Sequence, residues 1–206
     1  MRNQIEGLFF AYNMLTLKAQ EHKCNDGRSD IMGKDIIELK EYIRDVPDWP
    51  KKGILFRDIT PLLGEPKAFR AAVNELAADY TKAGIQYVAA VEARGFIFGS
   101  AVAAKLKAGF VPIRKKGKLP YRTESITYDL EYGSDTLQVH QDAVTSGAKV
   151  LMVDDLLATG GTMVAACKLI EKIGGQIAGI AFLIELSDLH GIDKLGGYKV
   201  KSIIRY

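Results

Sequence analysis

The sequence predicts an α/β fold in which a parallel sheet is covered by helices on both faces. Short apolar runs typical of buried strands alternate with segments whose apolar residues recur at helical spacing. The chain of 206 residues is long enough for one domain with a sizeable core. Its 48% hydrophobic and 26% charged residues are typical of globular proteins. Strands that alternate with helices form parallel sheets, which bind ligands beyond the carboxyl ends of their strands.

The predicted helices are segments in which apolar residues lie three and four positions apart. Pro47 marks the end of the first helix and Gly84 follows the second, since neither residue continues a helix well. The predicted helices cover residues 36–46, 69–80, 95–106 and 163–170.

The predicted strands are short apolar runs, several of them without a polar interruption, as in strands buried on both faces. Pro112 has no N–H group and therefore favours an end or edge position for its strand. The predicted strands cover residues 54–56, 87–91, 110–114, 150–155, 177–185 and 199–205.

Residues 115–142 interrupt this alternation with a polar excursion. Residues 115–125 are polar and cationic, and the alternating segments 126–128 and 136–140 then predict two exposed strands. A long polar excursion inside a compact α/β domain is often a lid over a binding site. The alternative is a solvated hairpin without a function.

The composition excludes several classes of partner. A formal net charge of +3 is too small to indicate nucleic-acid binding. The apolar run at residues 7–12 is too short to span a membrane, and no clean cleavage site of a signal peptide follows it. Cys24 and Cys167 cannot form a disulfide framework, which favours a reducing, cytoplasmic location. Three scattered histidines without paired cysteines predict no protein metal site.

Residues 1–31 differ from the rest of the chain. Residues 25–30 are polar and turn-forming, and the amphipathic pattern of a domain begins near Met32. We therefore expect a flexible extension, or an artefact of the choice of start codon, before a domain that covers residues 32–206.

Residues 150–162 carry the clearest functional signal. A buried strand ends in Asp154 and Asp155, and a loop with Gly160 and Gly161 leads into an amphipathic helix. A helix start has free backbone N–H groups and the positive end of the dipole, so it stabilises a phosphate. Glycine lets the backbone approach such an anion closely.

The acid pair adds the chemistry of a sugar to this phosphate site. Asp154 and Asp155 are suited to accept hydrogen bonds from a vicinal diol such as that of ribose, and Thr159 and Thr162 add hydroxyl donors. Helix capping and an ordinary turn explain single residues here, but not both acids together with the glycine pair. The loop lacks the Lys-Ser/Thr of a P-loop and the spacing of dinucleotide folds. The segment therefore predicts a site for a phosphorylated sugar.

Residues 91–96 show a second strand–loop–helix arrangement of the same kind. A buried strand ends, a charged loop turns at Gly95, and a helix begins, so Arg94 can grip a phosphate beside backbone donors. A lone Arg-Gly pair is weak evidence, since a surface arginine is the usual outcome. Two such sites in one sheet indicate a ligand with phosphates at both ends, such as 5-phosphoribosyl 1-diphosphate.

The run 154–162 resembles the phosphoribosyl-diphosphate signature of the type I phosphoribosyltransferases, in the version of their adenine-specific branch. The resemblance implies that family's fold, with a small hood segment over about residues 32–66 and a mobile hairpin lid over about 115–142. Three further segments resemble the purine-pocket segment, the diphosphate loop and the catalytic loop of the family, in that order: 56–61, 92–96, and 114–120 with 130–133.

The resemblance also implies roles for single residues. Phe56 and Leu156 are expected to flank the adenine plane, with Arg57 beside it. Trp49 stands where the family pattern has phenylalanine, which is a mild departure. The residues expected to hold the diphosphate are Arg94, Arg114, Lys115 and Lys118. Those expected to bind the phosphorylated ribose are Asp154, Asp155, Ala158, Thr159, Gly160, Gly161 and Thr162.

Glu131 is the candidate for accepting or relaying the adenine proton, and Tyr132 is expected to contact the ribose. A bound water or the diphosphate itself are alternative bases, and Glu131 is otherwise an exposed strand carboxylate. Mg²⁺ is expected to be carried mainly by the phosphoribosyl diphosphate. The resemblance further implies a homodimer.

The expected reaction transfers the 5-phosphoribosyl group to N9 of adenine and gives AMP and diphosphate, a step of purine salvage. One alternative is the same reaction on a 6-oxopurine, although residues 156–158 favour adenine. Another is a regulator that senses phosphoribosyl diphosphate without catalysis. The short N-terminal segment and weak charge argue against a DNA-binding regulator.

Overall fold

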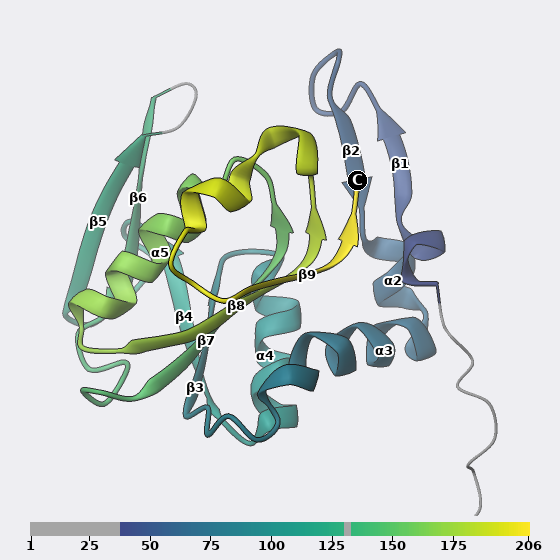
Figure 1. Cartoon of the computed structure of the whole chain (residues 1–206). Coiled ribbons are helices and arrows are strands. Elements are labelled where there is room, and N and C mark those ends of the chain that lie inside the picture. The colour runs from purple at the N-terminus through teal and green to yellow at the C-terminus, as the bar shows by residue number, and fades with distance from the viewer. Residues whose placement is uncertain (1–37, 130–132) are drawn as a thin grey trace, which may run out of the picture. The chain divides into compact units, whose positions relative to one another are not determined.

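The computed structural model describes residues 38–129 and 133–206 (Figure 1). Within these residues, one sheet has seven strands in the order β5-β6-β4-β3-β7-β8-β9, and β1 and β2 form a separate two-stranded sheet. The predicted extension at residues 1–31 lies outside the described residues.

The central strands of the large sheet run parallel, which confirms the predicted fold class. An antiparallel hairpin of β5 and β6 extends this sheet beyond β4. The strands are β3 (Tyr87–Val91), β4 (Gly109–Lys115), β5 (Thr123–Asp129), β6 (Ser134–His140), β7 (Lys149–Leu157), β8 (Gln176–Glu185) and β9 (Val200–Arg205).

Helices cover both faces of the large sheet because its central strands are apolar on both sides. Along β7, Leu151 and Val153 belong to one buried cluster, whereas Val150 and Met152 belong to the other. This period of two is that of a pleated strand. The first cluster packs against α3 (Pro66–Ala77) and α4 (Gly95–Leu106), and the second against α5 (Gly161–Lys172) (Figure 1).

The N-terminal hood differs from the prediction of one helix over residues 36–46, which is wrong for its described part. A 3₁₀ turn, η1 (Leu39–Tyr42), is followed by β1 (Arg44–Pro47), which pairs antiparallel with β2 (Leu55–Asp58). Apolar spacing alone does not distinguish a short helix from a turn followed by a strand. Residues 44–47 form a strand because they pair with β2. The hood also contains α2 (Thr60–Gly64).

The end or edge position predicted from Pro112 is also wrong, because Pro112 lies in the middle of β4, inside the sheet. Strand β4 lies between β3 and β6, and Pro112 pairs with Ala90 of β3. Strand β6 pairs with β4 only at Arg114 and Lys115. The proline therefore lies where β4 has a ladder partner on one side only, so its missing N–H group is tolerated inside the strand order.

The other predicted elements are confirmed with small shifts of their ends. The helix predicted over 69–80 begins at Pro66 and continues past Ala77 as the 3₁₀ turn η2 (Ala78–Tyr80). Two further 3₁₀ turns, η3 (Ser187–Leu189) and η4 (Gly191–Leu195), lie between β8 and β9. Among the helices of the described residues, none combines the length and the apolar character needed to cross a membrane.

Two glycines hold the loop after β7 against the start of η4. Gly160 has a φ of +79°, and a Cβ there would lie 2.4 Å from the carbonyl oxygen of Gly191. A Cβ on Gly191 would lie 2.0 Å from the carbonyl oxygen of Ala158. Side chains at either position would push the two backbones apart, so this contact fixes where the loop lies.

The Gly191→Ala variant should be less stable by about 1–3 kcal/mol, because the added methyl group overlaps the backbone of the loop. Urea unfolding measures this loss. The matched control is Gly196→Ala, whose methyl group would meet only the Asp193 carbonyl oxygen, at 3.7 Å. Equal unfolding midpoints for the two variants would contradict the close contact.

Candidate active site

A cavity of about 290 Å³ opens at the carboxyl ends of β3 and β7. The helices α4 and α5 begin at the same place, so the two predicted strand–loop–helix motifs meet in one site. Its lining includes Arg94, Asp154, Asp155 and Leu156, together with residues 158–162 and Glu92. The structure thus brings together most of the predicted sugar-phosphate residues.

The loop that leads into α5 has the form of an anion site. Gly160 precedes the helix in a left-handed conformation, and α5 begins at Gly161. No side chain of the loop caps this helix start. The first backbone N–H groups of α5 therefore remain available to a ligand, at the positive end of the helix dipole.

The acid pair is joined to the other loop by an ion pair. Nη2 of Arg94 lies 2.8 Å from Oδ2 of Asp155, whose side chain is only 8% exposed. The N–H group of Asp155 donates a hydrogen bond of 2.9 Å to Oδ1 of Asp154. A Cβ on Gly95 would lie 2.4 Å from that same Oδ1. Glycine at position 95 therefore makes room for the Asp154 carboxylate.

Enclosure by protein changes the acidity of this pair. Burial, and next the neighbouring charge of Asp155, raise the pKa of Asp154 well above its ordinary value. Burial also raises the pKa of Asp155, although Arg94 acts in the opposite direction. Apart from its ion pair with Arg94, Oδ2 of Asp155 accepts no hydrogen bond from the described residues. The site therefore keeps two acceptors that are costly to ionise without a ligand.

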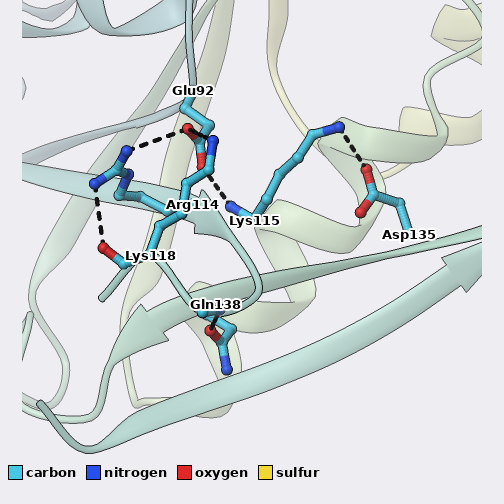
Figure 2. A network of polar contacts seen from close by, with 7 residues as sticks. Glu92, Arg114, Lys115, Lys118, Asp135 and Gln138 are labelled. Carbon is cyan, nitrogen blue, oxygen red and sulfur yellow. Dashed lines mark hydrogen bonds and ion pairs between the residues drawn. The ribbon is translucent and has the colours of Figure 1, made fainter. Parts of the chain in front are cut away.

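Glu92 organises the basic residues at the base of the predicted lid (Figure 2). Its side chain is 8% exposed and lies 3.3 Å from Nη2 of Arg114 and 2.8 Å from Nζ of Lys118. The backbone N–H group of Lys115 donates to its Oε1 at 2.6 Å. Burial alone would raise the pKa of Glu92, but these donors outweigh burial and hold that pKa below its ordinary value.

The hairpin itself holds the remaining basic residue. Nζ of Lys115 lies 3.0 Å from Oδ2 of Asp135 on β6. Gly117 donates its N–H group to Oε1 of Gln138 at 2.8 Å, which ties the basic loop to the same strand (Figure 2). On β5, the Tyr128 hydroxyl lies 3.2 Å from that of Thr162 and so connects the hairpin to the first turn of α5.

The aromatic residue predicted to flank the base lies beside this cavity. The Cζ atom of Arg94 lies 5.0 Å from the ring centroid of Phe56, so the hood reaches the diphosphate loop. Trp49 packs edge-on against Phe56, with 4.3 Å between the ring centroids. Leu156 lines the cavity itself. Arg57 forms an ion pair with Asp45 and does not line the cavity.

Several site residues were not expected from the sequence. Glu92 and Asp135 pair with lysines of the predicted lid, and Gly191 packs against the loop over residues 158–160. An acid two positions before Arg94, the arginine predicted to bind a phosphate, was the available signal for Glu92. Glu131 and Tyr132, the predicted proton acceptor and ribose contact, lie outside the described residues.

No group of three or more His, Cys, Asp or Glu side chains within residues 38–129 and 133–206 is arranged to hold a metal ion. The carboxylates of Asp154 and Asp155 are nevertheless oxygen donors of the kind that Mg²⁺ prefers. A magnesium ion that a substrate brings with it therefore fits the donor set of this cavity.

Comparisons with known proteins agree with this geometry. The family model of the phosphoribosyl transferase domain matches residues 63–204. The adenine phosphoribosyltransferase of Christiangramia forsetii is 54% identical over 170 residues, which are 82% of this chain and 99% of the relative.

Solved structures give the same result. The adenine phosphoribosyltransferase of Thermoanaerobacter pseudethanolicus is 51% identical, with a TM-score of 0.78 over 82% of this chain and 98% of that one. The enzyme of Giardia lamblia, a complex with 9-deazaadenine, is 39% identical, with a TM-score of 0.77 over 82% and 96%. The family inferred from the motifs is therefore confirmed: this chain belongs to the type I phosphoribosyltransferases, among the adenine phosphoribosyltransferases.

Proposed function

We propose that the protein transfers the 5-phosphoribosyl group from 5-phosphoribosyl 1-diphosphate to N9 of adenine. The N9–C1′ bond forms, the bond from C1′ to the diphosphate oxygen breaks, and adenine loses its N9 proton. The products are AMP and diphosphate. The observation that carries this proposal is the meeting of an anion loop, a diol-binding acid pair and a second anion-binding arginine in one cavity.

The two loops of the cavity divide the substrate between them. The α5 loop, residues 158–162, takes the 5-phosphate on its free N–H groups. Asp154 and Asp155 accept hydrogen bonds from the ribose hydroxyl groups. Arg94, assisted by Arg114, Lys115 and Lys118, binds the diphosphate at the other end. The basic residues thus face the phosphate groups of the substrate, and the carboxylates face its hydroxyl donors.

Catalysis in this scheme needs no protein nucleophile. The transition state resembles an oxocarbenium ion, and negative charge grows on the departing diphosphate. Arg94 and the basic residues of the lid stabilise that charge in a site from which water is excluded. Phe56 and Leu156 hold the base so that N9 faces C1′. Glu131 is the proposed acceptor or relay for the N9 proton.

When bound, Mg²⁺ neutralises part of the charge on the diphosphate. Diphosphate and ribose oxygens would hold the ion, and Asp154 and Asp155 would hold the same ribose hydroxyl groups from the protein side. We further propose that the protein acts in the cytoplasm as a homodimer, with the hairpin over residues 115–142 as a lid that closes on the substrate. Residues 1–31 are proposed to be an extension outside the catalytic domain.

Diphosphate release in the presence of Mg²⁺ and phosphoribosyl diphosphate tests the function directly. Adenine, hypoxanthine, guanine, xanthine and orotate are offered separately, with the Asp154→Asn/Asp155→Asn protein as control. Release with adenine alone, lost in the control, is the expected result. Release with another base would overturn the assignment of the base site. Binding of phosphoribosyl diphosphate without turnover would favour a regulator.

The Asp154→Asn variant should lose activity and gain stability. The raised pKa of Asp154 means that its ionisation at neutral pH costs folding free energy, which asparagine avoids. The loss of a charged acceptor should lower kcat/KM about 10- to 100-fold. Enzyme kinetics and urea unfolding at pH 7 measure the two effects. Asp193→Asn, at a side chain that is 75% exposed, is the control and should change neither. A variant that loses stability would contradict the strained acid pair.

The Glu92→Gln variant should be less stable at pH 7 by about 1–3 kcal/mol, because a buried acceptor of three donors loses its charge. The pKa of Glu92 is below its ordinary 4.5 in the fold, so its contribution is complete above that pH. It disappears as the pH falls through the lower value of the folded state. Unfolding free energies of both proteins between pH 7 and 3 should therefore converge at the acid end.

Glu124→Gln is the control for Glu92→Gln. Glu124 also accepts from a lysine, but its ion pair with Lys172 lies at the surface, where such pairs contribute little. An equal loss for both variants, or a difference for Glu92→Gln that does not depend on pH, would contradict the role of the Glu92 carboxylate.

A further inference from the structure

The hairpin of β5 and β6 is attached to α5 at both ends of that helix (Figure 1). At the helix end, Nζ of Lys172 lies 2.7 Å from Oε2 of Glu124 on β5. At the helix start, the hydroxyl groups of Tyr128 and Thr162 lie 3.2 Å apart. The strand from Glu124 to Tyr128 spans about 13 Å and the helix from Thr162 to Lys172 about 15 Å, so β5 runs along α5 between the two contacts. The course of the whole strand therefore brings Tyr128 to the first turn of α5.

Packing and strand pairing both fix the side chain of Tyr128. It packs against the buried cluster that contains Met163 of α5. In the ladder it lies opposite Asp135 on β6, whose Oδ2 atom lies 3.0 Å from Nζ of Lys115. Directly opposite residues of an antiparallel pair have their side chains on the same face of the sheet. The hydroxyl group that meets Thr162 is thus part of a hairpin face that is held against α5.

Thr162 lies where the cavity meets the start of α5. It directly follows Gly161, the first residue of the helix, and lines the cavity. Because no side chain caps this helix start, the Thr162 hydroxyl is not used on the backbone of its own helix. Within residues 38–129 and 133–206, its one hydrogen-bond partner is the Tyr128 hydroxyl. The Thr162 hydroxyl therefore lies between the hairpin and the free N–H groups at which an anion is stabilised.

The direction of the hydrogen bond between the two hydroxyl groups decides what Thr162 can offer a ligand. A hydroxyl group has one proton to donate and two lone pairs with which to accept. The geometry allows either oxygen to be the donor. When Tyr128 donates to Oγ1 of Thr162, the Thr162 proton is free for a further acceptor. A phosphate at the start of α5 presents acceptor oxygens and therefore favours this direction, in which each hydrogen bond of the chain strengthens the next.

We propose that Tyr128 is a positioning residue for the 5-phosphate, because its hydroxyl group donates to Oγ1 of Thr162 and directs the Thr162 proton toward the phosphate oxygens. This inference rests on the proposed function, in which residues 158–162 bind the 5-phosphate. Other residues, Phe56 and Leu156, are proposed to hold the base. Loss of the Tyr128 hydroxyl should therefore weaken the binding of a phosphorylated ribose and leave the binding of adenine nearly unchanged.

The test begins with Tyr128→Phe, which removes the hydroxyl group and keeps the ring. Titration calorimetry should show a Kd for ribose 5-phosphate about 3- to 10-fold higher, and the KM for phosphoribosyl diphosphate should rise by a similar factor. The KM for adenine should change less than about two-fold. Tyr87→Phe is the matched control and should change none of these constants. The Tyr87 hydroxyl also lies 3.2 Å from a threonine hydroxyl, that of Thr145, but Tyr87 does not line the cavity.

A double-mutant cycle identifies the partner of Tyr128. In the Thr162→Val background, which lacks the accepting hydroxyl, Tyr128→Phe should cause no further loss of affinity for ribose 5-phosphate. In the Thr162→Ser background, which keeps that hydroxyl, the loss should remain about 3- to 10-fold. Thermal unfolding of each variant verifies that the measured constants are those of folded protein.

A merely structural role would give another pattern. An equal rise of both KM values, the same loss of affinity in the Thr162→Val background, or an equal loss in Tyr87→Phe would overturn the proposal. Ribose 5-phosphate that does not bind the unmodified protein would overturn it together with the phosphate site. Absence of turnover with adenine in the unmodified protein would contradict the proposed function itself. Turnover with an unchanged Kd for ribose 5-phosphate in Tyr128→Phe would contradict only the role of Tyr128.

Discussion

The ion pair between Arg94 and Asp155 is the interaction on which the rest of the site depends. It joins the loop after β3 to the last residues of β7, and β3 and β7 are neighbouring strands of the sheet. Without the arginine, two adjacent enclosed carboxylates would repel each other and pay the full cost of burial. Gly95 belongs to the same arrangement, since any side chain there would collide with Asp154. Parallel strand ends, one arginine and one glycine thus allow an enclosed acid pair to exist at the cavity, where the ribose is proposed to bind.

The electrostatically unfavourable groups of the site are held by a rigid part of the fold. The acid pair has raised pKa values, and the loop at Gly160 adopts a left-handed conformation against Gly191. The raised pKa values are unfavourable for the free protein, whereas glycine adopts the left-handed conformation without a steric penalty. The two apolar clusters on either face of the sheet hold these loops in place. Glu92 acts in a similar way for the lid, because it holds two cations close to where an anion is expected to bind.

Much of this arrangement could be predicted from the sequence, because local pattern and tertiary structure agree there. The apolar run before Asp154 and the glycine pair after it correctly gave a strand, a loop and a helix start. The predictions failed where pairing between strands distant in the sequence determines the local conformation or the place of a strand in the sheet. Residues 44–46 have helical spacing but pair with β2, and Pro112 lies in an interior strand with one side unpaired. The contacts of Gly191 and Tyr128 join segments distant in sequence, and no local signal marks them.

We propose that the junction of the Arg94 loop with the end of β7 recognises a phosphorylated ribose. A crystal structure of the protein with bound AMP tests this claim most directly. The 5′-phosphate is expected on the backbone N–H groups of residues 159–162, and the ribose hydroxyl groups within hydrogen-bond distance of Asp154 and Asp155. The Arg94–Asp155 pair should stay intact. A phosphate bound elsewhere, or a ribose that does not contact the acid pair, would contradict it.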